Sequence, residues 1–205
     1  MPSAATARKR TTGSRDDDAR ATRDALVKAG LELFAKRGYS EVGTEEIVKR
    51  ARVTRGALYH HFTDKRDLFR AVHERVEESL VERIAGQMQG VSDPWEVMVT
   101  GTRAFLEACD EPAVKQITLV DAPAVLGWRE WREIDERYGL GLMKAALGGA
   151  MEAGVLRTAP LDAISHLMLG ALAEAAFVIA NADDPAAARK DAETALFALL
   201  EGLKV

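Results

Sequence analysis

The chain has 205 residues, of which 47% are hydrophobic and 29% are charged, and its formal net charge is −4 at pH 7. This is the composition of soluble globular proteins with one large domain or two small ones. A single cysteine, Cys109, excludes an intrachain disulfide, and residues 1–20 lack the apolar segment of a signal peptide, so we expect a cytoplasmic protein.

The charge is unevenly distributed along the chain. Residues 1–75 hold 17 lysines and arginines against 11 aspartates and glutamates, a balance of 17 − 11 = +6. The remaining residues hold 11 against 21, a balance of 11 − 21 = −10. A basic first third on an acidic body predicts that only the first third meets an anion such as nucleic acid.

Residues 1–19 are polar, small and charged, and we expect them to be disordered because they can bury little apolar surface. This segment is a basic arm, with cationic side chains at Arg8, Lys9, Arg10 and Arg15. Such an arm can reach into a DNA minor groove, and a solvated tail is the simpler interpretation. Both interpretations stay open.

From Arg20 onward the sequence predicts helices. We expect a first helix that ends near Gly38. Small and apolar residues recur on one face of it, at Leu26, Gly30, Leu33 and Phe34. A second short helix carries Ile47, Val48 and Ala51, and a third lies within residues 54–62. Asp64 is placed as the N-cap of a long fourth helix, whose apolar residues recur every four positions from Leu68 onward.

The rest of the chain also predicts helices joined by short connections. Asp93 and Pro94 begin one that ends near Cys109, and Pro112 and Pro123 interrupt the stretch that follows. Three more helices are expected at about residues 128–153, 161–182 and 185–203. No segment alternates like a strand, so the predicted fold class is all-α with about nine helices.

Residues 164–182 are apolar enough to suggest a membrane span. The run is barely long enough to cross a bilayer, and His166 and Glu174 interrupt it. A helix that is apolar nearly all round is more often buried between other helices, so we expect no membrane association.

Residues 43–62 have the pattern of a helix-turn-helix, whose second helix enters the DNA major groove. Thr54 can cap that helix, and Arg55 in its first turn has donors that match guanine O6 and N7. Gly56 and Ala57 keep one side of the helix slim, so its backbone can approach base edges. Donors for phosphate oxygens stand at its border, at Tyr59, His60 and Lys65.

The adjacent histidines His60 and His61 point in different directions on a helix, so they do not form a chelating pair and no metal site is expected. The sequence holds no Ser/His/Asp signature and no glycine-rich phosphate loop. We therefore expect neither an enzyme nor a bound cofactor.

Residues 20–76 resemble the N-terminal domain of the TetR/AcrR family of transcriptional regulators. The resemblance rests on GLELFAKRGYSEVGTEEIVKRARVTRGALYHHFTDKRDLF at residues 30–69, in which RGY, GALYHHF and DK fall at the family's spacing. It implies a three-helix DNA-binding domain over residues 20–76, and a larger helical domain over residues 77–205 for ligand binding and dimerisation.

The resemblance also implies roles for single residues, with Arg55, Gly56 and Ala57 facing bases. Phosphates would be contacted by Gly43 or Thr44, Tyr59, His60 and Lys65. The sequence departs from the family at two positions. The family's hydroxyl residue stands one place later here, at Thr44. Arg52 occupies a turn position that is usually glycine, where a positive φ would cost an arginine about 1 kcal/mol; alternatively, Arg52 contacts a phosphate.

A homodimer on a palindromic operator is a further implication, because two recognition helices about 34–36 Å apart match one turn of DNA. The last two helices of each subunit would form a four-helix interface. Its residues would be Leu167, Gly170, Ala171, Ala175, Val178, Ala192, Ala195, Leu196, Leu199 and Leu203. The alternative is that these two helices only complete the core of a monomer.

The C-terminal part holds aromatic and methionine side chains that could line a pocket for an apolar or aromatic effector. These are Trp95, Met98, Phe105, Trp128, Trp131, Tyr138, Leu142 and Met143. Ordinary core packing is the alternative for each of them. Polar recognition could come from Arg103, Glu107, Asp121 or Asp135, and the sequence does not select among these.

We therefore expect a sequence-specific DNA-binding transcriptional regulator, most simply a repressor that a small-molecule ligand releases from its operator. Activation instead of repression stays open. The alternative function is a helical small-molecule-binding or interaction protein with a vestigial helix-turn-helix. The basic first third and the intact Arg55, Tyr59 and Lys65 argue against that alternative.

Overall fold

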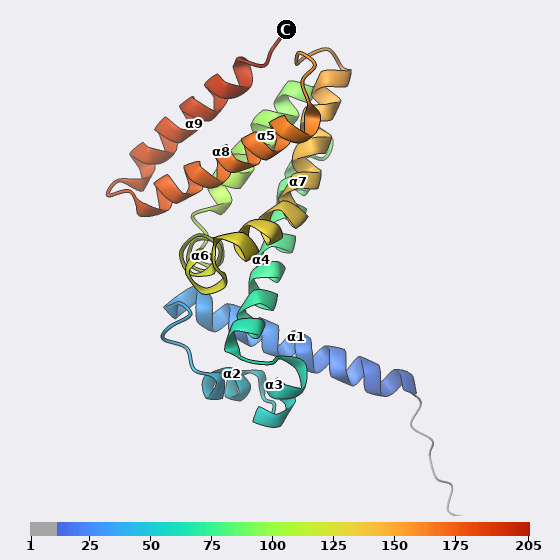
Figure 1. Ribbon diagram of the computed structural model, residues 1–205, viewed down its shortest axis with the longest axis vertical. Helices are drawn as coiled ribbons and strands as arrows, with labels where there is room; N and C mark the ends of the chain where they lie inside the picture. Colours follow the sequence, from blue (N-terminus) through green and yellow to red (C-terminus); the bar gives the residue numbers. More distant parts are fainter. Residues whose placement is uncertain (1–11) are drawn as a thin grey trace, which may run out of the picture.

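The structure is a computed structural model that describes residues 12–205 (Figure 1). Over this range the chain forms nine α-helices and one π-helix, and its only β pairing is a bridge between Leu156 and Lys204, so the all-α prediction is confirmed. The elements are α1 (Thr12–Arg37), α2 (Thr44–Ala51), α3 (Arg55–His61), α4 (Lys65–Met88), α5 (Pro94–Ala108), η1 (Val114–Asp121), α6 (Ala122–Leu126), α7 (Trp128–Glu152), α8 (Leu161–Asn181) and α9 (Pro185–Glu201).

The first helix, α1, begins earlier than the sequence predicted. Residues 12–19 are helical, so the prediction that they are disordered is wrong. Lengthening an existing helix needs no new nucleus, and the packed part of α1 supplies that helix, so a polar extension suffices. Arg15 therefore belongs to α1. The other basic residues of the predicted arm, Arg8, Lys9 and Arg10, lie outside the described residues.

Helices α2 and α3 pack against α1 and against each other, and α1 packs against α4 (Figure 1). Their shared core consists of fully buried side chains, namely Leu26, Phe34, Ile47, Leu58, Leu68 and Phe69. A Cβ at Gly30 would lie 2.9 Å from Val72 Cγ2, so glycine allows α1 and α4 to approach closely. The short α2 and α3 are therefore held by burial of one apolar face each rather than by their own length.

The long helix α4 runs from this three-helix unit into the body of the protein (Figure 1). Asp64 caps it by accepting a hydrogen bond from the Asp67 N–H at 2.8 Å, which confirms the predicted cap. Its 24 residues span about 36 Å at 1.5 Å per residue. Its second half packs against α5 and α7, so one rigid element contacts both parts of the chain.

The body is built from α5, α7, α8 and α9, with η1 and α6 between it and α1 (Figure 1). By length and composition α8 could cross a membrane, but it packs against α7 and α9 and buries Leu169, Leu172 and Ala176. The stretch that the two prolines were expected to interrupt forms η1 and α6. Pro123 stands in the first turn of α6, where a missing N–H costs nothing.

Candidate DNA-binding surface and ligand cavity

The turn between α2 and α3 depends on Arg52, whose backbone is left-handed with φ 58° and ψ 37°. The positive φ that the sequence analysis considered for this position is present, and among the described residues Arg52 is the only non-glycine with one. The Val53 N–H donates to the Val48 carbonyl at 3.0 Å, which ends α2 and directs the chain into α3. This sharp turn therefore carries about 1 kcal/mol of backbone strain.

The seven-residue helix α3 is fixed at its start and through its middle. The Thr54 hydroxyl accepts a 3.1 Å hydrogen bond from the Ala57 N–H, as predicted for an N-cap, and Leu58 is fully buried. A Cβ at Gly56 would meet only Thr54 Oγ1, at 3.9 Å, so the fold itself would tolerate a side chain there. The bare surface at Gly56 is thus open to an outside partner. The predicted contact residues Arg55, Gly56, Tyr59 and His60 are exposed and Ala57 is half-buried.

Arg55 lies on the exposed side of α3 and is partly engaged within the protein. Its Nη1 lies 2.9 Å from Glu45 Oε1, and its guanidinium lies 5.6 Å from the centre of the Tyr59 ring. Both side chains of the ion pair are largely exposed, so the pair contributes less than about 1 kcal/mol and can yield to a base. The contact that we predicted for Arg55 remains a prediction.

Lys65 has a structural role that the sequence did not suggest. Its Nζ donates to the carbonyls of Tyr39 and Val42 at 2.8 and 2.9 Å, and it lies 3.9 Å from the centre of the Tyr39 ring. Burial lowers the pKa of Lys65, and the Asp121 carboxylate opposes that change. The ammonium therefore ties α4 to the turn after α1, which leaves one N–H for the phosphate contact we predicted.

The other predicted phosphate contacts lie near the same surface. Gly43 is the N-cap of α2, with φ −91° and no atom near the place of a Cβ, and Thr44 is the first residue of the helix.

The rings of His60 and His61 meet edge to face with centroids 5.1 Å apart. No group of metal-binding side chains occurs among the described residues. Burial lowers the pKa of His61, and electrostatic repulsion from His60 and Arg23 lowers it further.

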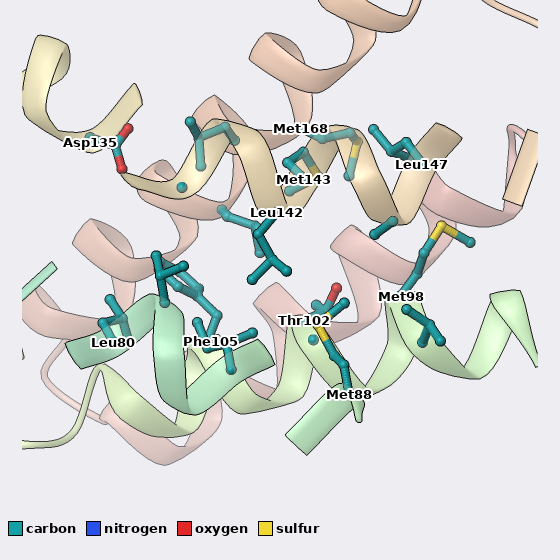
Figure 2. Close-up of a pocket in the computed structure, with 18 of the residues that line it drawn as sticks. Leu80, Met88, Met98, Thr102, Phe105, Asp135, Leu142, Met143, Leu147 and Met168 are labelled. Carbon is teal, nitrogen blue, oxygen red and sulfur yellow. The ribbon is translucent and has the colours of Figure 1, made fainter. Parts of the chain in front are cut away.

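A cavity of about 80 Å³ lies in the body between α4, α5, α7 and α8 (Figure 2). Four of the predicted pocket residues line it: Met98, Phe105, Leu142 and Met143. Sequence reasoning missed the contributions of α4 and α8, which include Leu80, Ile84, Met88, Met168, Leu169 and Leu172. Apart from Glu77, Thr102 and Asp135, the side chains that line the cavity are apolar, so it favours an apolar body.

The other four predicted pocket residues do not line this cavity, and that part of the prediction needs correction. Trp131 is buried near α6 with its ring 5.4 Å from that of Phe177, and Trp128 is 66% exposed beside it. The Trp95 ring is covered by Lys204, whose Nζ lies 3.4 Å from its centre. Tyr138 packs against the core around α4.

One end of the cavity is acidic. Asp135 lies there, at the opposite end from Met98 and Leu147 (Figure 2), and Glu77 also lines the cavity. Burial raises the pKa of Glu77 to about 8, the Asp135 charge adds to the rise, and the Thr118 hydroxyl opposes it. Burial likewise raises the pKa of Asp135 to about 6.

Of the four polar residues considered for ligand recognition, the cavity includes only Asp135. Arg103 pairs with Glu193, Asp121 binds a backbone N–H, and Glu107 is exposed. The sequence did contain a signal for Glu77, because it falls with His73 on the otherwise apolar face of α4. Both are buried, and burial lowers the pKa of His73 to about 4.

The predicted interface residues of α8 and α9 divide into two groups. Leu167, Val178 and Leu199 are 69%, 51% and 54% exposed, and Ala195 is also exposed. Half-buried positions are Gly170, Ala171, Ala192 and Leu203. Ala175 and Leu196 are only 9% and 2% exposed, so they belong to the core of the single chain, and the prediction must be corrected for them.

Comparison with known proteins identifies relatives of this chain. Residues 26–72 match the family described as "Bacterial regulatory proteins, tetR family", and residues 95–203 match "Tetracyclin repressor-like, C-terminal domain". The crystal structure of a TetR-family transcriptional regulator from Pectobacterium atrosepticum is 35% identical, with 96% of this chain and 98% of that chain covered and a TM-score of 0.84.

More distant matches include both sequences and a further solved structure. The Transposon Tn10 TetC protein of Escherichia coli is 24% identical over 74% of this chain and 76% of its own length. The crystal structure of RolR in complex with the ligand resorcinol is 22% identical, with 90% of this chain and 89% of that chain covered and a TM-score of 0.72. Three other curated regulators match over 26% to 46% of their own length.

Proposed function

This chain belongs to the TetR family and is a DNA-binding transcriptional regulator rather than an enzyme; from that premise we propose that it represses transcription in the cytoplasm until a small molecule enters its cavity. The observation that carries the proposal is the span of α4. Its first residue, Lys65, binds backbone carbonyls between α1 and α2, and its second half lines the cavity through Leu80, Ile84 and Met88.

Binding to an operator would use two copies of α3, one from each subunit of a homodimer. The exposed apolar side chains of α8 and α9, Leu167, Val178 and Leu199, support such a dimer because isolated protomers would leave them in water. Two recognition helices about 34–36 Å apart would then read a palindromic site. Arg55, Gly56 and Ala57 would face bases, while Thr44, Tyr59, His60 and Lys65 would contact phosphates.

The size of the cavity suggests how a ligand would act. Its volume of about 80 Å³ is below the roughly 150 Å³ that accommodates a benzene molecule in a protein core. A drug-sized ligand would therefore have to push the surrounding side chains and helices apart. Four flexible methionines, Met88, Met98, Met143 and Met168, would allow this. Since α4 is one of the walls, its displacement would change the spacing of the two α3 helices and favour release of DNA.

The direct test is fluorescence anisotropy with DNA from upstream of the protein's own gene, measured over a salt series. Wild type is compared with Arg55→Ala and with Arg129→Ala, which removes an exposed arginine of the body. We expect tight, salt-dependent binding that exceeds binding to random DNA and is lost only in Arg55→Ala. Weak binding that is equal on both DNAs, and equal again on sequences selected from random DNA, would support the vestigial helix-turn-helix instead.

A further inference from the structure

Glu77 is a buried carboxyl group whose surroundings are incomplete. The side chain is 4% exposed and lines the cavity, and its Oε1 has no hydrogen-bond partner within residues 12–205. A buried polar atom without a partner destabilises the fold, and a charged one does so more strongly. Glu77 Oε1 lies 3.8 Å from His73 Nδ1, too far for a hydrogen bond, and because Glu77 lines the cavity a ligand bound there is the available partner for its carboxyl group.

The charges around the cavity are unbalanced. Among the described residues that line it, Glu77 and Asp135 are acidic, and none is lysine, arginine or histidine. Behind the wall, Arg132 is the nearby cation, and its guanidinium is shared between Asp135 at 2.8 Å and Glu136 at 3.1 Å. No cation is left for Glu77, so a ligand that ionises this carboxyl group must bring a positive charge of its own.

The neighbours of Glu77 cannot supply that charge. His73 lies 3.8 Å from Glu77 Oε1, but its own burial lowers its pKa to about 4, so it is neutral near pH 7. The other titratable groups near Glu77 are Cys109, Asp135 and Tyr138, none of which becomes a cation. With a pKa raised to about 8, Glu77 holds a proton in the empty cavity at neutral pH.

We propose that the effector is an organic cation, with a compact apolar body that packs among the cavity's methionines and leucines and a protonated amine that binds Glu77. This inference rests on the proposed ligand-controlled function of the same cavity. The amine donates hydrogen bonds to the carboxylate and compensates its charge, and the proton that Glu77 held passes to solvent. The ion pair then forms where water is excluded, so it discriminates strongly between head groups.

The test uses three apolar bodies, 2-phenylethyl, n-hexyl and 2-naphthylethyl, each carrying an amine, a hydroxyl or a carboxylate at the same position. Isothermal titration calorimetry gives the affinity of each compound for wild type, for Glu77→Gln and for Glu82→Gln, a matched loss of one exposed carboxylate on α4. We expect at least one amine to bind wild type tenfold or more tighter than its alcohol and carboxylate. Glu77→Gln should abolish that preference and Glu82→Gln should keep it.

A second measurement needs no variant, in case Glu77→Gln does not fold. Titration of wild type with the amine at pH 7 in phosphate and in Tris buffer reports proton release, which should approach one proton per amine and be absent for the alcohol. The proposal is overturned if no amine binds, if an alcohol or carboxylate binds equally well, or if no proton is released. Operator affinity is measured separately: amines that bind yet leave it unchanged would support the ligand class and reject the release mechanism.

Discussion

The Asp121 carboxylate accepts a 2.8 Å hydrogen bond from the backbone N–H of Tyr39, 82 residues earlier in the chain. This bond joins the last residue of η1 to the turn after α1, and Lys65 binds the carbonyl of Tyr39 from the other side. On the same π-helix, the Thr118 hydroxyl lies 3.4 Å from His73 Nδ1, near the acidic end of the cavity. Helix η1 therefore connects the cavity to the DNA-binding helices by a second route beside α4.

Replacing the acceptor should weaken that route. Asp121→Ala leaves the Tyr39 N–H without its partner, so we expect the free energy of unfolding to fall by about 1–3 kcal/mol. The ratio of operator affinities without and with a bound amine should also fall. Urea unfolding and anisotropy measure the two quantities. Asp183→Ala, at an exposed position in the turn before α9, is the control. A stability loss with an unchanged affinity ratio would limit Asp121 to a structural role.

Strain at Arg52 should be removable. Arg52→Gly should raise the free energy of unfolding by about 1 kcal/mol, because glycine adopts a positive φ without a Cβ clash. Arg52→Ala keeps the strain and lacks the charge, so its stability should stay near that of wild type. If Arg52 also contacts a phosphate, both variants should reduce the slope of operator affinity against salt by about 1. Unchanged slopes would reject that contact.

The Thr54 cap should matter for a helix of only seven residues. Thr54→Ala removes the hydroxyl that accepts the Ala57 N–H, and we expect a loss of about 1 kcal/mol in the free energy of unfolding. Thr54→Ser retains the hydroxyl and should remain close to wild type. Operator affinity should follow the same order, since a frayed α3 presents Arg55 poorly. Equal stability of the alanine and serine variants would contradict the role of the cap.

Glu77 should make the stability of the fold depend on pH. Its folded pKa of about 8 lies above the ordinary glutamate value of 4.5, so the folded state holds a proton that the unfolded state loses, and stability falls as pH rises towards 8. His73 has the opposite sign, because its pKa is lowered from 6.5 to about 4 and its effect lies below pH 6.5. Asp135, with a pKa raised to about 6, is mostly ionised above pH 6.5, so little of its effect on stability remains there.

Between pH 6.5 and 8 the effect of Glu77 should therefore dominate among these buried groups. We expect the free energy of unfolding to decrease by up to about 2 kcal/mol across this range in wild type. Glu77→Gln should show little of that decrease, and Glu82→Gln should show all of it. Urea titrations at three pH values would measure the slopes. Parallel slopes in all three proteins would mean that Glu77 is already ionised in the folded state.

The exposed face of α8 should control assembly. Leu167→Glu places a charge at a position that is 69% exposed in the single chain, so the fold should tolerate it while a dimer through α8 and α9 would not. Analytical ultracentrifugation should show monomers, and operator affinity should drop at least tenfold. Val120→Glu, at an exposed apolar position on η1, should remain dimeric. A dimeric Leu167→Glu protein would place the interface elsewhere.

The DNA-binding part could be predicted in detail because its signals are local. Thr54 and Asp64 lie three positions before the N–H groups that they cap, and the family resemblance marked Arg52 as the turn position that is usually glycine. The dual role of Lys65 was not visible, since its partner carbonyls belong to a turn more than twenty residues away. Residues 12–19 show the limit of composition, because a polar segment can extend a helix that is packed elsewhere.

The cavity could be predicted only in part because helical periodicity gives the face of a helix and not the height along it. Trp131 and Leu142 are eleven positions apart, so they lie on nearly the same face of α7 but about 16 Å apart along its axis. At the height of Leu142 the neighbours are α4 and α5, which leave a cavity, whereas Trp131 meets Phe177 of α8 in solid core. That difference depends on how the helices cross, which no single segment encodes.

Because the cavity is smaller than the proposed effector, a compound can occupy it without causing release of DNA. A molecule small enough to fit about 80 Å³ without moving the walls would bind and leave the spacing of the recognition helices as it was. Such a molecule would act as an antagonist, since it would block the site while the operator stays occupied. Potency in this regulator would then follow the volume that a compound adds to the cavity, and of two compounds with equal affinity only the larger would release the operator.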